Sequence, residues 1–201
     1  MPLSTIGANQ IASGAVDTTQ LASNAVTNAK LASGAVTAGD MPAGSVLQMQ
    51  KAVKKDTQTF TSTTYADITG LSITLTPRDA NSKFIISFAV WDAGTHYKTY
   101  LNLLRGTTVL HADADGSGDS RNRSTSSFVT EDNEMDVHGN MHCHSMTVVD
   151  EPATASSVTY KLQTKARSGH TAYVNRSTID RASTEYDDRF VSHILVMEIA
   201  G

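Results

Sequence analysis

The chain has 201 residues, of which 39% are hydrophobic, 6% aromatic and 18% charged, and its formal net charge at pH 7 is −4. This length suffices for one domain of ordinary size and an additional segment. The mild charge without a basic block argues against nucleic acid as a partner, and the lack of an apolar run near 18 residues argues against membrane insertion. Cys143 is the single cysteine, so the fold must rest on packing without an intrachain disulfide.

A ten-residue repeat occupies the N-terminal segment. The stretches 11–16, 21–26 and 31–36 are near copies with the sequence Ile/Leu-Ala-Ser-Gly/Asn-Ala-Val. Self-similarity at a fixed period marks units that bury their apolar side chains only against neighbours or partner chains. Large apolar residues fall at every fifth position, and we expect these residues to form self-association contacts: Ile6, Ile11, Val16, Leu21, Val26, Leu31, Val36 and Met41.

A spacing of five fits neither regular secondary structure. On an α-helix the apolar positions would wind around the cylinder, and on a strand they would alternate between faces. One interpretation is a series of short helical turns, capped at Asp17 and Thr27 and ended by left-handed residues at Gly14, Asn24 and Gly34. A β-type spiral with Gly or Asn at its turns is the second interpretation. The sequence leaves both open.

The repeat is a poor candidate for order in a single chain. Burying one Leu or Val stabilises by about 1.5–3 kcal/mol, whereas fixing the backbone of each residue costs roughly 1–2 kcal/mol. Two such side chains in ten residues cannot offset that cost without contacts from other chains. A flexible linker is the alternative, but a linker would not keep Leu or Ile and Val at alternate fifth positions. The pattern therefore favours an oligomeric shaft.

Strand signals begin at about Gly44 and continue to the C-terminus. Residues 71–75 alternate between apolar and polar until Pro77, and residues 158–163 alternate in the same way. Residues 100–110 indicate a hairpin. Residues 83–91 are nearly all apolar, as expected for a strand covered on both faces, and we expect the apolar stretch 194–199 to lie in the core. The sequence predicts an all-β domain, an antiparallel sandwich or jelly roll.

The motifs of this region resemble the jelly-roll heads of phage fibre proteins. They include Leu-Arg-Gly-Thr-Thr at 104–108 and Val-Thr-Tyr-Lys-Leu at 158–162, and the Ser-Gly-Ala-Val-Thr stretch at 33–37 is similar to the shafts that precede such heads. Further matching segments lie at 44–48, 64–77, 82–86, 149–153, 173–177 and 197–201. The polar stretch 119–144 departs from the family pattern.

This resemblance implies a homotrimer located in the virion. Residues 1–43 would form an N-terminal attachment and trimerisation shaft, with the apolar ladder as the trimer contact, and residues 44–201 would form a head resembling the tumour necrosis factor and complement-type jelly rolls. The N-terminus would dock onto other virion proteins. The head loops, around 92–98, 111–127 and 131–140, would meet a host cell-surface glycan or protein, with receptor-binding residues unspecified.

The sharpest local signal for a metal site is His142-Cys143-His144, with His138 upstream. On a strand, His142 and His144 point to the same face. In a trimer, three such pairs near the axis would supply six imidazoles, which suits iron or nickel. Met146 continues the same face, so a packed strand is the simpler alternative.

A second possible cation site is a calcium loop near Asp113 and Asp115, where oxygen-bearing side chains alternate. The second half of the loop fails, because Ser124 stands where an EF-hand needs its bidentate Glu. A solvated turn between strands is the alternative.

The motifs of common hydrolases and phosphate-binding enzymes are missing from the sequence, so we expect a protein that is not an enzyme. The main hypothesis is a structural virion protein, a homotrimeric fibre of the tail or head that presents its jelly-roll head for adhesion to the host. Two alternatives remain: a capsid or neck decoration or assembly protein without receptor binding, and a hydrolytic tail tip.

Overall fold

The computed structural model describes residues 12–17, 19, 21–23, 25–94, 97–112, 122–130, 141–180, 182 and 187–201. The chain divides into two units, one ending at Met41 and the other spanning Pro42–Gly201. The first unit consists of turns and short 3-10 helices, and the second is all-β, with no α-helix among the described residues.

The first unit repeats two kinds of turn. In the first kind, an alanine N–H bonds to the carbonyl three residues earlier, and this bond recurs at Ala15, Ala25 and Ala35 with N···O distances of 2.9–3.0 Å. Gly14 and Gly34 occupy the third position of such turns with φ of 79° and 78°, a backbone conformation that favours glycine. The predicted left-handed glycines are therefore present, but they lie within β-turns. The second kind of turn is the 3-10 helix, as in η2 (Asn28–Lys30) and η3 (Ala38–Asp40).

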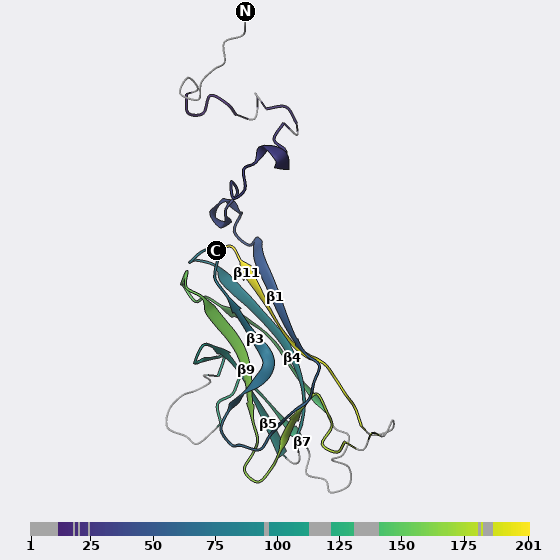
Figure 1. Ribbon diagram of the computed structural model, residues 1–201. Coiled ribbons are helices and arrows are strands. Elements are labelled where there is room, and N and C mark those ends of the chain that lie inside the picture. The colour runs from purple at the N-terminus through teal and green to yellow at the C-terminus, as the bar shows by residue number, and fades with distance from the viewer. Residues whose placement is uncertain are drawn as a thin grey trace, which may run out of the picture. The chain divides into compact units, whose positions relative to one another are not determined.

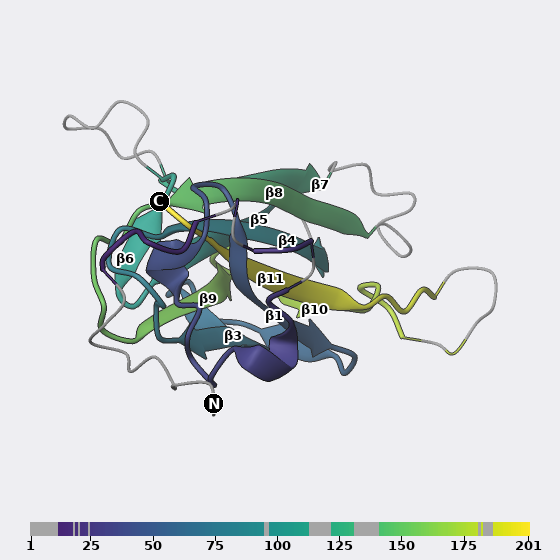
Figure 2. The ribbon, with the colours of Figure 1, turned by 90° about the horizontal axis from the view of Figure 1, so that it is seen from above.

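In the second unit, sheet A is built around the long central strand β4. All its pairings are antiparallel, and the strand order is β1-β11-β4-β10-β2, with β8 on the other edge of β4. Figure 2 shows β11, in yellow, between β1 and β4. The strands of sheet A are β1 (Val46–Lys54), β2 (Gln58–Phe60), β4 (Lys83–Gly94), β8 (His142–Asp150), β10 (Ala172–Val174) and β11 (Ser192–Ile199).

Sheet B is also antiparallel and has the order β3-β9-β5-β6, with β7 pairing β5. The hairpin predicted for residues 100–110 is β5 followed by β6, and Gly106 with φ of 59° lies in its turn. Strand β3 ends at Leu75, before Pro77, as the sequence predicts. The strands of sheet B are β3 (Ala66–Leu75), β5 (Tyr97–Arg105), β6 (Thr108–Leu110), β7 (Ser126–Thr130) and β9 (Val158–Lys165).

The two sheets enclose one hydrophobic core, an arrangement compatible with a β-sandwich (Figure 1). Alternate residues of each strand point inward, so Phe84, Ile86 and Phe88 of β4 meet Leu71 and Leu162 of sheet B in this core. The prediction of an all-β antiparallel fold is confirmed.

Strand β4 and strand β11 differ from expectation on one face. Each buries every second residue, but the intervening side chains, such as Ile85 and Leu195, are only partly covered in the single chain. The prediction that residues 83–91 are covered on both faces, and that residues 194–199 lie in the core, is therefore met on the inner face alone.

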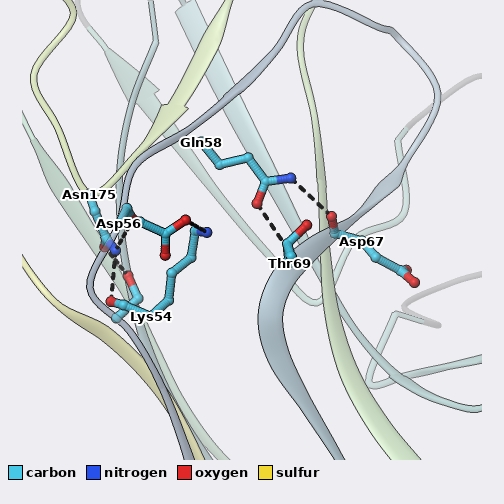
Figure 3. A network of polar contacts seen from close by, with 7 residues as sticks. Lys54, Asp56, Gln58, Asp67, Thr69 and Asn175 are labelled. Carbon is cyan, nitrogen blue, oxygen red and sulfur yellow. Dashed lines mark hydrogen bonds and ion pairs between the residues drawn. The ribbon is translucent and has the colours of Figure 1, made fainter.

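Polar side chains hold the sandwich together where regular pairing is interrupted (Figure 3). Asn175, with φ of 63°, donates from Nδ2 to the carbonyls of Lys54 and Asp56 at 2.8 and 3.0 Å, which fixes the link between β1 and β2. Gln58 accepts from the Thr69 N–H at 2.9 Å and donates to the Asp67 carbonyl. The carboxamide of Gln58 thus serves the backbone of β3 within its register shift between Asp67 and Ser72.

A buried carboxylate also links the sheets. Asp150 at the end of β8 accepts from Arg105 Nη1 at 2.8 Å and from the Tyr160 hydroxyl at 2.7 Å, both of which belong to sheet B. Burial, followed by the hydrogen bond to Asp150, raises the pKa of the Tyr160 phenol, so this hydroxyl remains a donor.

Candidate functional site

The apolar positions of the ten-residue repeat are exposed in the single chain. Their exposed fractions range from 39% at Met41 to 55% at Val36. The exposed set within the described residues is Val16, Leu21, Val26, Leu31, Val36 and Met41. The first two members of the predicted ladder, Ile6 and Ile11, lie outside the described residues. In one copy of the chain, the regularly spaced apolar side chains of the repeat are therefore accessible to solvent.

Polar side chains stabilise the turns between these positions. Thr37 donates its backbone N–H and its hydroxyl to the Asp40 carboxylate at 2.8 and 2.7 Å, and these hydrogen bonds lower the pKa of Asp40. Asp17 accepts in the same way from the hydroxyl and N–H of Thr19, which lowers the pKa of Asp17. The side chain of Asp17, predicted as a cap, thus accepts a backbone hydrogen bond two residues further along the chain. Local turns thus pair these polar groups, while the apolar side chains between them stay exposed.

A second cluster lies inside the sandwich around His144, which is fully buried. Its Nε2 is 3.0 Å from Asp92 Oδ2 and 3.2 Å from Thr99 Oγ1, and its Nδ1 is 2.9 Å from Ser126 Oγ. The four residues come from β4, β8, β5 and β7, and the cluster therefore ties sheet A to sheet B.

Ser126, His144 and Asp92 are linked in the order of a serine hydrolase triad, but the serine lies at Nδ1 and the carboxylate at Nε2, the reverse of the triad arrangement. A catalytic imidazole must pass its proton to a substrate, which requires access to the ring. His144 has no exposed surface, and the ring of Phe128 packs edge-on against it with centroids 4.7 Å apart. The cluster thus has the geometry of an internal clamp between sheets.

The burial and the contacts of His144 also bear on the metal site predicted at His142 and His144. A histidine binds metal through an unprotonated ring nitrogen that is free of other partners. Both nitrogens of His144 are engaged by protein groups, and its burial keeps it from an axis between copies. The ring of His142 stacks on the ring of Phe128 at 5.3 Å between centroids. This arrangement favours the packed-strand alternative.

Other predicted sites fall outside the part of the chain that the structure describes. These are the calcium ligands Asp113 and Asp115, His138, and the loop 131–140. The loops 92–98 and 111–127 are described in part.

Sequence reasoning missed the partners of His144. Asp92, Thr99 and Ser126 lie 52, 45 and 18 residues away along the chain, and each is an ordinary polar residue within a strand. The one available signal was the inward register of Asp92 with the apolar residues of its strand, since a buried carboxylate requires a partner.

A scan against protein-family models and a search of curated proteins found no match to this chain. Among the described residues, no helix has the length and apolar character needed to cross a membrane.

Proposed function

We propose that this chain is a structural virion protein, a homotrimeric phage fibre of the tail or head. Its ten-residue repeat forms the trimeric shaft, and its β domain is a jelly-roll head that contacts the host surface. The observation that carries this proposal is the ladder of exposed apolar residues, which recurs at every fifth position from Val16 to Met41.

The exposed ladder supports self-association on energetic grounds. Complete burial of a Leu or Val side chain stabilises by about 1.5–3 kcal/mol, so covering the half that remains exposed contributes about 1 kcal/mol for each position. One position is too weak to hold chains together, but a repeated series on three chains adds many such contributions. The small residues between them, Ala, Ser and Gly, let backbones approach closely around a shared axis.

The strand order of the head supports the jelly-roll assignment. The eight principal strands, taken in chain order, are β1, β3, β4, β5, β6 with β7, β8, β9 and β11. Sheet A then has the order first-eighth-third-sixth and sheet B the order second-seventh-fourth-fifth. Apart from the fourth and fifth strands, which form a hairpin in sheet B, successive strands therefore alternate between sheets in the manner of two Greek keys.

Trimerisation gives such a head its adhesive mechanism. Three copies of each head loop are presented together, so weak contacts to a cell-surface glycan or protein combine into avidity. Attachment of the N-terminus to other virion proteins would hold the heads away from the particle.

The mass of the purified full chain in solution tests the assembly. Light scattering at micromolar concentration should give three times the chain mass of 21.4 kDa. The variant Leu21→Ser/Leu31→Ser removes six burials from a trimer, on the order of 6 kcal/mol, and should dissociate it at the same concentration. The matched control Ser23→Ala/Ser33→Ala changes exposed positions of the same repeats and should remain a trimer.

Two results would overturn this assembly. A monomeric parent refutes the trimer, and a trimer that the Leu21→Ser/Leu31→Ser variant leaves intact refutes the role of the ladder. Adhesion is tested separately by binding of labelled trimer to host cells and by electron microscopy of the particle. A head that faces the capsid or neck and binds no cells would support the decoration alternative.

A further inference from the structure

The outer face of sheet A, meaning the side chains of β1, β11, β4 and β8 that point away from the core, is largely apolar. The register places Met49 opposite Met197, and Ile85 between Met197 on one side and Val149 on the other, so apolar side chains adjoin across all four strands. The apolar members of this face are Val46, Met49, Val53, Ile85, Ala89, Trp91, Val149, Leu195, Met197 and Ile199.

Several of these side chains are strongly exposed in one copy. Met49 is 60% exposed, Val46 56% and Val149 55%, and they lie on the two strands that flank β11 and β4. The apolar surface thus spans the width of the sheet. A contiguous exposed apolar patch of this kind marks an interaction surface.

The outward side of sheet B provides an internal comparison. On β3 and β9 it carries Thr74 and Thr159, whose hydroxyls lie 2.8 Å apart, and Lys161, whose ammonium group is 2.9 Å from the Asp67 carboxylate. Gln163 bonds to the same carboxylate. These two strands of sheet B present paired polar groups to solvent. The outer face of sheet A also carries polar side chains, such as the hydroxyls of Thr147 and Ser87 at 3.4 Å, but its row Met49, Met197, Ile85 and Val149 is apolar across all four strands.

The sequences of the two central strands of sheet A match a sheet covered on both sides. Residues 84–91 and 194–199 are apolar runs interrupted only by Ser87 and Glu198, a pattern typical of strands buried on both faces. The core supplies one cover. The described part of the chain supplies no second cover for these strands, which is why the expected burial of both faces is found on the inner face alone.

The position of β1 in the chain favours a second copy of this chain as the partner that covers the outer face of sheet A. Strand β1 directly follows the repeat, and its first residue, Val46, extends the five-residue apolar series beyond Met41. Five residues span at most about 18 Å, so copies joined through their repeats bring their β1 strands close together. Lys83 at the margin of the face is paired with Glu151 at 3.0 Å, and Lys51 is the outward cation of β1.

We propose that the heads associate with one another through the outer face of sheet A, so that the apolar contact begun in the repeat continues over β1, β11, β4 and β8. This inference rests on the proposed homotrimer and names the surface by which its heads meet.

Cysteine accessibility in the full-length assembly tests the proposal. In a Cys143→Ala background, Met49→Cys and Val149→Cys place a thiol at either edge of the face, and Ser72→Cys places one at an exposed position of sheet B. Alkylation by a small maleimide is followed by mass spectrometry, with light scattering on each variant. We expect the two sheet A thiols to react at least tenfold more slowly than the thiol at position 72.

The outcomes distinguish failure of the sheet A contact from failure of the proposed homotrimer. Equal alkylation rates in a variant that remains oligomeric refute the sheet A contact and leave the repeat shaft intact. A monomeric parent refutes both. Protection that persists in the dissociated Leu21→Ser/Leu31→Ser background would assign the cover to the same chain, and this would overturn association between copies.

Discussion

The clamp around His144 can be tested by removing one of its partners. His144→Leu fills most of the volume of the imidazole but leaves the Asp92 carboxylate without its 3.0 Å contact to Nε2. Asp92 is 1% exposed, so water cannot replace that contact. Leaving a buried acceptor without its hydrogen bond costs about 1–3 kcal/mol. A domain of this size loses about 2–4 °C in Tm per kcal/mol, so we expect Tm to fall by about 2–12 °C.

The measurement is thermal and urea unfolding of the full chain at fixed protein concentration, since assembly shifts apparent stability. Trp91, the single tryptophan, precedes Asp92 in β4 and stacks on Phe190, so its fluorescence reports on this region. The control is Ser145→Ala, which lies at an exposed position of β8 next to His144 and should leave Tm within about 2 °C of the parent value.

A double-mutant cycle separates the lost pair from lost packing. In Asp92→Leu/His144→Leu neither polar group is left without its partner, so the double variant should be destabilised by at least 1 kcal/mol less than the sum of the two single variants, on the order of measured couplings between contacting residues. Additive effects, or a cost of His144→Leu below about 1 kcal/mol, would refute the clamp.

Two further predictions concern a buried hydroxyl and a titrating side chain. Tyr160→Phe removes the 2.7 Å hydrogen bond to Asp150 and should lower the free energy of unfolding by about 1.5–3 kcal/mol in urea titrations, whereas an unchanged midpoint would show that the bond is not stabilising. The pKa of His193, on the outer face of sheet A, is lowered by burial and then by Lys51, so the folded state resists protonation and stability should fall as pH drops below about 6.5. His193→Gln should therefore reduce the loss of Tm between pH 7.5 and pH 5.5, and an identical loss in parent and variant would contradict this reasoning.

The periodic features of this protein were predictable from sequence. Two-residue alternation at 71–75 and 158–163 located β3 and β9, and the turn at Gly106 located the hairpin of β5 and β6. In the repeat, Gly14 and Gly34 were expected to be left-handed, and they are. These features depend on neighbouring residues, which fix backbone preference and the side of the strand that is apolar.

The polar interior was not predictable in the same way. His144 was singled out as a metal ligand because it stands two residues from His142, but its contacts lie on three other strands. The register of β4 with β8 and of β5 with β7 brings those side chains together.

Hydrophobic period and turn residues were enough to predict a repeat followed by an antiparallel β domain, because both act over short distances along the chain. Which polar groups meet in the core, and which apolar side chains stay exposed, depends on how distant strands pair. Strand β4 has apolar residues on both faces, so its sequence does not reveal which face is covered by the rest of the chain. Sheet order settles that question, because sheet B covers the inner face of β4 and leaves Ile85 and its neighbours on the outer face only partly covered.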